Sequence, residues 1–143
     1  MRQILLSLLI GVAAMSAAPA QDAARTPASG SAERTLLLDT ARAPAEQKLH
    51  QQIQLDVQQL KVSGDWAFLH ARLQNAGGKP VDYAGTEFAE AAEQGFKSKT
   101  YAALLRRNGE HWDVTTYVIG PTDPAWLGWS DQFGAPSVLF EGE

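Results

Sequence analysis

Alternation of apolar and polar residues predicts four β-strands between residues 53 and 119. The first begins at Ile53 and keeps one apolar parity as far as Val57, whereas Leu60 and Val62 lie on the opposite parity. A shift of one residue moves an apolar set to the other face of a sheet, so we expect a β-bulge near Gln58-Gln59.

The second strand is the clearest one and follows a turn at Ser63-Gly64-Asp65, which predicts a hairpin with the first strand. One of its faces is small and apolar and suits a position under a helix; it consists of Ala67, Leu69, Ala71 and Leu73. The other face is aromatic at one end and polar at the other; it consists of Trp66, Phe68, His70 and Arg72.

The third and fourth strands form a second predicted hairpin. Thr100 to Arg107 and His111 to Ile119 flank Asn108-Gly109, and Asn-Gly between two apolar runs is a strong hairpin signal. Strict alternation in the fourth strand gives one face to Trp112, Val114, Thr116 and Val118, and the other to Asp113, Thr115, Tyr117 and Ile119.

A helix is predicted to precede the strands. Ser31 is a suitable N-cap, and an apolar stripe follows it at Leu36, Leu37, Leu38 and Ala41. Proline lacks the backbone N–H and disfavours a helix interior, so we expect Pro44 to interrupt the helix and open a short second segment, Ala45 to His50.

Two further segments surround the second hairpin. Residues 81–99 form either a helical insertion or an ordered loop; Thr86 would cap a helix from Glu87 to Gln94, and Gly95 would end it. After the last strand, Asp123 and Pro124 predict the N-cap and first residue of a short helix that ends near Gln132. Helical spacing then places three aromatic residues on one side: Trp126, Trp129 and Phe133.

This order of elements predicts an α+β domain over residues 32–140, with the N-terminal helix packed on a four-stranded antiparallel meander and a short C-terminal helix. Residues 21–31 are small and polar and are expected to form a flexible leader. Helix-wrapped meanders of this size include cystatin-like and nuclear-transport-factor-2-like architectures, and such an analogy of shape implies no function.

The first twenty residues have the pattern of a cleaved signal peptide. Arg2 is followed by an apolar run from Ile4 to Ala14 and by Ala18-Pro19-Ala20, a small-x-small cleavage site that places Gln21 at the mature N-terminus. A retained membrane helix is the alternative, but the run is short for about 30 Å of hydrocarbon. We therefore expect a periplasmic or secreted protein without a stable membrane anchor.

Composition limits the chemistry. The 143 residues include no Cys, which excludes disulfides, zinc–thiolate sites and thiol nucleophiles. The net charge is −4, and removing residues 1–20 takes away one base and leaves 11 bases and 16 acids, or −5. This acidic balance disfavours a nucleic-acid partner, and no cofactor-binding motif is present.

Candidate catalytic groups do not form known motifs. The three histidines, His50, His70 and His111, lack the local spacing of metal ligands, and surface or partly buried histidines are the favoured interpretation. The serines of the folded part are outside any nucleophile elbow; they are Ser63, Ser98, Ser130 and Ser137. Glu87, Glu90 and Glu93 have the spacing of a solvated helix face.

Aromatic and arginine residues are the better candidates for binding. Trp66 and Trp112 are expected in the core, whereas Trp126 and Trp129 fit either the core or a binding surface. The arginines of the strands are expected to form a cross-sheet network with aspartates; this set comprises Arg72, Arg106, Arg107, Asp65, Asp113 and Asp123.

Three segments together resemble small exported bacterial proteins of uncharacterised function. The segments are Gly-Asp-Trp-Ala-Phe (64–68), Ala-Leu-Leu-Arg-Arg (103–107) followed by Gly109 and Trp112, and Gly-Pro-Thr-Asp-x-x-Trp (120–126). The resemblance spans most of residues 33–140. It implies a shape and a compartment, and it implies no catalytic residues.

Two functions follow as hypotheses. The leading one is a non-enzymatic interaction module, such as an inhibitor, immunity-type or envelope-associated protein, whose partner is an envelope or secreted protein. The alternative is a small-ligand binder or enzyme with a pocket between helix and sheet, lined by His70, Arg72 and Tyr117. The candidate binding residues for both are Trp126, Trp129, His70, Arg72, Arg106 and Tyr117.

Overall fold

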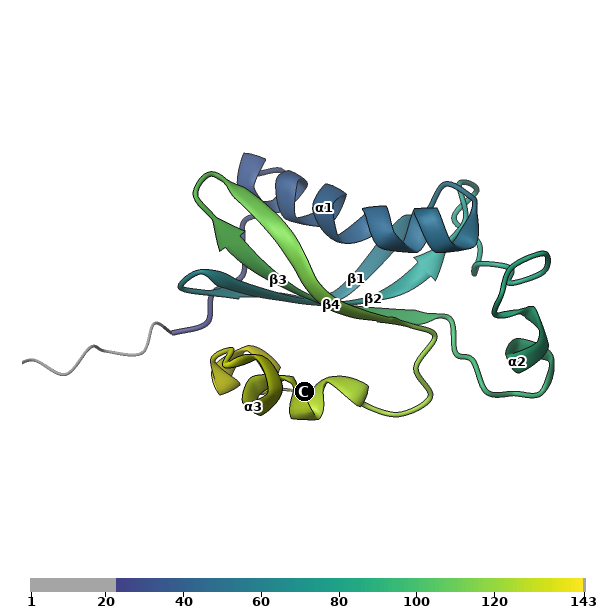
Figure 1. The fold of residues 1–143 in the computed structure, drawn as a ribbon. Helices are drawn as coiled ribbons and strands as arrows, with labels where there is room; N and C mark the ends of the chain where they lie inside the picture. The colour runs from purple at the N-terminus through teal and green to yellow at the C-terminus, as the bar shows by residue number, and fades with distance from the viewer. Residues whose placement is uncertain (1–22, 143) are drawn as a thin grey trace, which may run out of the picture.

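Four antiparallel strands form one sheet in the order β1-β2-β3-β4, which confirms the predicted meander. The computed structural model describes residues 23–142, so the predicted signal peptide lies outside the described residues. The strands are β1 (Gln54–Ser63), β2 (Trp66–Gln74), β3 (Thr100–Asn108) and β4 (His111–Ile119). Helix α1 (Ala32–Leu49) covers one face of the sheet, here named the α1 face, and the chain after β4 covers the other, named the C-terminal face (Figure 1).

Each edge strand contains a bulge. In β1 the register moves from Val57 to Gln59 against β2, which leaves Gln58 as the extra residue and confirms the predicted position. In β4 the register skips Thr115 against β3, a second bulge that the sequence did not predict.

The bulge at Thr115 corrects the predicted faces of β4. Trp112 and Val114 lie on the α1 face, but beyond the bulge Tyr117 and Ile119 lie on that face as well. Val118 packs on the C-terminal face instead. One extra residue exchanges the two parities, so strict alternation holds only up to Val114.

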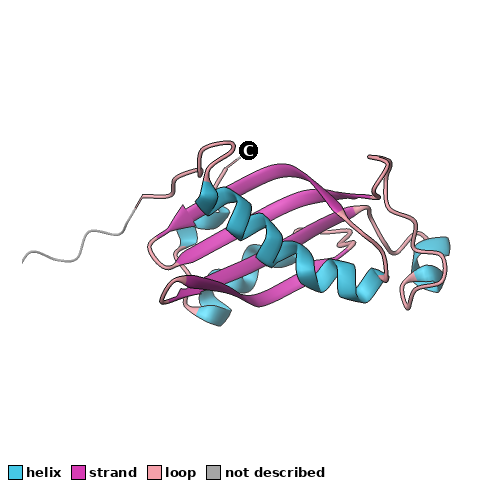
Figure 2. Ribbon diagram, turned by 90° about the horizontal axis from the view of Figure 1, so that it is seen from above, coloured by secondary structure: helices cyan, strands magenta, loops and turns pink. Residues whose placement is uncertain are grey.

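Helix α1 lies diagonally across the sheet and buries one stripe of residues (Figure 2). The stripe has a spacing of four and consists of Leu37, Ala41, Ala45 and Leu49. Ser31 is the N-cap, and its Oγ accepts a hydrogen bond from the N–H of Arg34 at 3.2 Å.

The prediction of a break at Pro44 is wrong, because α1 is one helix with Pro44 inside it. Burial of Ala41 and Ala45 on either side of the proline explains the continuity, since tertiary packing outweighs the local cost. The Tyr101 hydroxyl also donates a buried hydrogen bond of 2.8 Å to the carbonyl of Ala41 and so attaches this turn of the helix to β3.

The described part of the predicted leader is attached to the sheet. Arg25 and Val62 exchange two backbone hydrogen bonds of 2.8 Å at the edge of β1. The Arg25 guanidinium also forms two hydrogen bonds to the Glu33 carboxylate, and Pro27 is buried. Arg25 therefore pairs with the edge of β1 within the segment that was predicted as a leader.

The C-terminal segment is defined here as Ala125–Phe140. It contains a 3₁₀ helix η1 (Ala125–Gly128), helix α3 (Trp129–Phe133) and a 3₁₀ helix η2 (Ser137–Phe140). The predicted N-cap at Asp123 is wrong: η1 begins one residue later, and only the backbone carbonyl of Asp123 accepts a hydrogen bond, from Ala125. Gly134 ends α3 in the left-handed conformation.

The insertion between β2 and β3 contains a single short helix, α2 (Ala89–Glu93), at one end of the sheet (Figure 1). Phe88 occupies the N-cap, so the predicted cap at Thr86 is wrong, although the Thr86 hydroxyl accepts a hydrogen bond from the Phe88 N–H. The insertion is fixed to the end of β4, because Ser98 accepts a hydrogen bond from the Tyr83 hydroxyl and donates its N–H to Gly120.

Candidate functional site

The C-terminal face brings together most of the residues that the sequence suggested for binding. Phe68, Ala102 and Leu104 form its floor, and Trp129 and Leu139 of the C-terminal segment cover them as a second buried cluster. Open grooves remain beside this cover, and two of them contain predicted binding residues.

Trp129 belongs to the core. Only 7% of it is exposed, and its ring packs edge-on against Phe68 with the centroids 6.3 Å apart. Trp126 is half-buried at the margin of the same cluster, with its ring 4.7 Å from that of His70. Trp129 is therefore a core residue, whereas Trp126 lies at the border between the core and the surface.

The first groove, named the Trp66 groove, has a volume of about 550 Å³. The β1–β2 turn with Trp66 and Arg106 forms one wall, and the stretch from Ser130 to Ser137 forms the other. Trp66 is half-buried, so its prediction as a core residue is wrong. It is the first residue of β2 and lies directly after the β1–β2 turn.

Arg106 lies over the ring of Trp66, with Cζ 5.0 Å from the ring centroid. β2 and β3 pair these two residues directly, so the strand register creates the contact. The predicted network forms only in part: Asp65 pairs with Arg107 at 2.8 Å, and Arg72 approaches Asp56 at 3.8 Å. Among residues 23–142, no carboxylate forms an ion pair with Arg106.

The second groove, named the His70 groove, has a volume of about 340 Å³ and a polar lining. It lies over β1, β2 and the start of β3, and its lining consists of Gln58, Gln59, His70, Arg72 and Thr100. Burial, followed by the nearby positive charge of Arg72, lowers the pKa of the His70 imidazole below its ordinary value. The histidine is therefore mostly neutral near pH 7.

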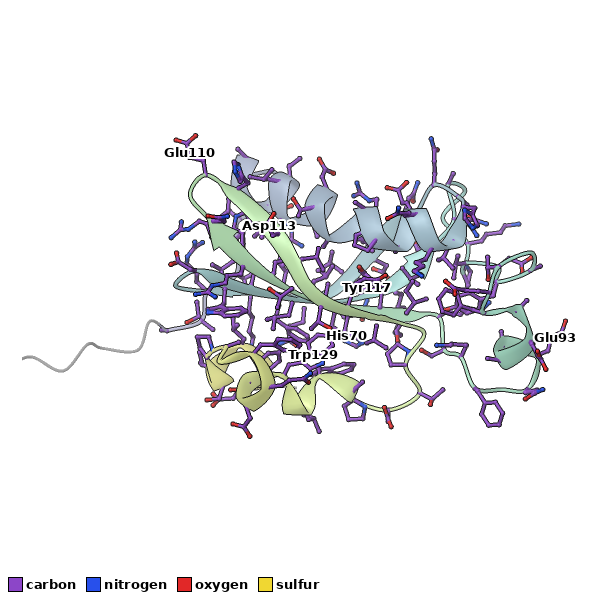
Figure 3. The ribbon with its side chains drawn as sticks, viewed as in Figure 1. His70, Glu93, Glu110, Asp113, Tyr117 and Trp129 are labelled. Carbon is purple, nitrogen blue, oxygen red and sulfur yellow. The ribbon has the colours of Figure 1, made fainter. Side chains whose placement is uncertain are left out.

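Tyr117 lies on the opposite side of the sheet from His70, which Figure 3 shows directly. Its ring packs near Tyr101 in the cluster under α1, with the centroids 6.1 Å apart. The predicted pocket lined jointly by His70, Arg72 and Tyr117 is therefore wrong, because the bulge at Thr115 turns Tyr117 toward α1. A groove of about 440 Å³ does exist between α1 and β1, but other residues line it, among them Arg42, Glu46 and Gln54.

The serines and histidines give little support to catalysis. Ser98 and Ser130 donate their hydroxyl protons to backbone carbonyls, of Pro121 and Ala135, so neither is poised as a nucleophile. Across residues 23–142, no three side chains of His, Cys, Asp or Glu are grouped so as to hold a metal ion. In the same part of the chain, no helix has the length and apolar character needed to cross a membrane.

The Trp66–Arg106 pair is the feature that sequence reasoning missed. The sequence pattern predicts Trp66 as a core residue and Arg106 as part of a charge network, and it does not predict their contact. Their contact depends on the register between β2 and β3, and no hairpin turn fixes that register in the sequence, because residues 75–99 intervene.

Comparisons with protein-family models, with curated proteins and with solved structures find no match to this chain.

Proposed function

We propose that this chain is an exported, non-enzymatic interaction module that binds an envelope or secreted protein through the Trp66 groove. The observation that carries the proposal is Arg106: its guanidinium lies over a half-buried tryptophan, lines an open groove and has no ion-pair partner among the described residues. Tryptophan and arginine are the residues most enriched at the energetic centres of protein interfaces.

Charge indicates what the partner presents to the groove. Asp65 is already paired with Arg107, and Asp131 lies on the opposite wall, whereas Arg106 has no ion-pair partner within the described part of the chain and can bind a carboxylate of the partner. The planar ring of Trp66 supplies apolar area next to that charge. A partner with an acidic side chain beside an apolar one fits this arrangement.

Export is part of the proposal and is supported by the sequence of residues 1–20 and by the resemblance to small exported bacterial proteins. The intact mass of the protein recovered from the periplasm or medium tests it. A chain that begins at Gln21 is expected, and a cellular protein that still carries Met1 would contradict cleavage.

Affinity purification of the tagged protein from envelope extract, followed by binding measurements with the purified partner, tests the interaction. The informative variant is Arg106→Glu, and Lys79→Glu is a control with the same change of charge on an exposed loop at the far end of β2. A partner that binds the parent and the control, but binds Arg106→Glu about tenfold more weakly or less, supports the proposal.

Equal binding by Arg106→Glu, or recovery of no partner by the parent, would contradict the proposal. Both variants change exposed side chains, and circular dichroism and thermal melting verify that they remain folded. Turnover of a defined substrate that a single polar substitution abolishes would contradict the non-enzymatic assignment.

A further inference from the structure

Two side chains with unused hydrogen-bond donors converge on the His70 groove. Arg72 carries five N–H donors, and the one ion pair it forms within residues 23–142 is with Asp56, at an N–O distance of 3.8 Å that is too long for a hydrogen bond. Neither the Arg72 guanidinium nor the His70 imidazole has a hydrogen-bond partner within residues 23–142. The two residues alternate along β2 and so point to the same face.

The other polar side chains of the groove already have partners. The Gln58 amide donates to the carbonyl of Asp56 at 3.2 Å, and the Gln59 amide donates to the carbonyl of Leu139 at 3.4 Å. The Thr100 hydroxyl shares a hydrogen bond of 2.8 Å with Ser98. The side-chain oxygens of Gln58 and Gln59 can still accept, whereas Arg72 and His70 contribute unused N–H donors, so a ligand that binds these two residues must carry acceptors.

Packing restricts the orientation of His70. Its ring lies against Trp126 at a centroid distance of 4.7 Å, and in the sheet it stands opposite Gln59 on one side and Ala102 on the other. The Arg72 side chain is freer to move than the His70 ring, because 65% of it is exposed. Its neighbours in the sheet are the strands β1 and β3. A fixed donor beside an adaptable, charged one suits the capture of a small charged group.

We propose that the His70 groove is an anion-binding site that takes a carboxylate or phosphate group between Arg72 and His70. The guanidinium holds two oxygens in a bidentate contact, and the imidazole N–H contacts the anion from the side. The site does not depend on the function proposed for the Trp66 groove, because the two grooves share no lining residue and the buried Phe68 separates Trp66 from His70 along the same face of β2.

Binding at this site is coupled to the protonation of His70. Two charged groups lie near His70: Arg72, on the same strand, and Asp56 of β1, which contacts Arg72 and not the imidazole. The neighbours from β3 and from the C-terminal segment are uncharged; they are Ala102, Thr100 and Trp126. An anion between Arg72 and His70 adds a negative charge to that of Asp56 and raises the histidine pKa. By linkage, the anion binds more tightly as the pH falls through that pKa.

Titration of the three histidine imidazoles by NMR, with and without inorganic phosphate or acetate, tests the site in the purified protein. We expect phosphate or acetate to raise the pKa of His70 while His50 and His111, which lie outside the groove, serve as internal controls. In Arg72→Gln the affinity for the anion should fall about tenfold or more. Arg107→Gln is the matched control, because Arg107 is paired with Asp65 away from this groove.

Comparison of the two anions distinguishes a phosphate site from a carboxylate site, and either result supports the proposal. Equal shifts of all three histidines would show unspecific screening and overturn it. An unchanged His70 in the presence of both anions, or an equal response in Arg72→Gln, would overturn it as well. Unchanged spectra of His50 and His111 in the variants show that the fold is intact.

Discussion

Replacement of Trp129 by alanine tests whether the C-terminal segment is part of the hydrophobic core. Trp129 is 7% exposed and lies in a cluster with Phe68, Ala102, Leu104 and Leu139. A buried tryptophan removes about 150–250 Å² from water, which at about 25 cal/mol per Å² corresponds to about 4–6 kcal/mol.

This value is an upper bound for the variant, because the site can relax. Trp126, Phe133 and Phe140 border the cluster and are only half-buried, so they can move into part of the cavity. We therefore expect Trp129→Ala to lower the free energy of unfolding by about 3–4 kcal/mol, toward the lower end of the range for such substitutions.

Urea unfolding followed by circular dichroism measures this loss, with Leu127→Ala as the control. Leu127 lies two residues before Trp129 but is 67% exposed, so its substitution should change the free energy of unfolding by less than about 0.5 kcal/mol. A loss below about 1 kcal/mol in Trp129→Ala, or equal losses in both variants, would refute the assignment of this segment to the core. A Trp126→Ala/Trp129→Ala pair is accordingly a poor probe of binding, because it would also lower the free energy of unfolding.

Three further predictions concern the fold. Gly120 has φ +65°, and a Cβ there would lie 2.8 Å from both the Ser98 carbonyl oxygen and the Tyr83 hydroxyl, so Gly120→Ala should cost about 2–3 kcal/mol in thermal melts; an unchanged melting temperature would contradict this. Burial raises the pKa of Tyr83 from 10 to about 12, so its neutral form is favoured in the fold. The stability that Tyr83 contributes through this shift is complete below pH 10, is lost as the pH rises to about 12, and amounts to at most about 2–3 kcal/mol. Tyr83→Phe should therefore lose less stability between pH 8 and 11 than the parent, and an equal loss would count against this. His50 ends α1 with φ 54°, so His50→Gly should raise the free energy of unfolding by about 1 kcal/mol in urea, and a decrease would show that the left-handed conformation is not strained.

The strands were predictable because their patterns and turns agree. The change of parity before Leu60 revealed the bulge of β1, and Asn108-Gly109 fixed the second hairpin. The bulge of β4 left no such trace, since Val114 and Tyr117 on either side of Thr115 are equally suited to a buried face. The continuity of α1 through Pro44 was also hidden, because it depends on packing against the sheet.

The candidate site was predictable only as far as it follows from a single strand. His70 and Arg72 share a face by alternation alone, so their common face follows from the sequence, whereas the groove itself does not. The position of Trp126 against His70 and that of Arg106 over Trp66 depend on tertiary docking and strand register. Local patterns contain no information about either contact.

The bulges at Gln58 and Thr115 also have a consequence for aggregation. β1 and β4 are the outer strands of the sheet, and each is interrupted near its middle, so a second chain finds only a short regular ladder to extend. At the end of β1, the pairing of Arg25 with Val62 occupies backbone groups that an incoming strand would use. Each outer strand therefore carries a feature that hinders the pairing of a strand from a second chain, the kind of pairing that begins edge-to-edge aggregation.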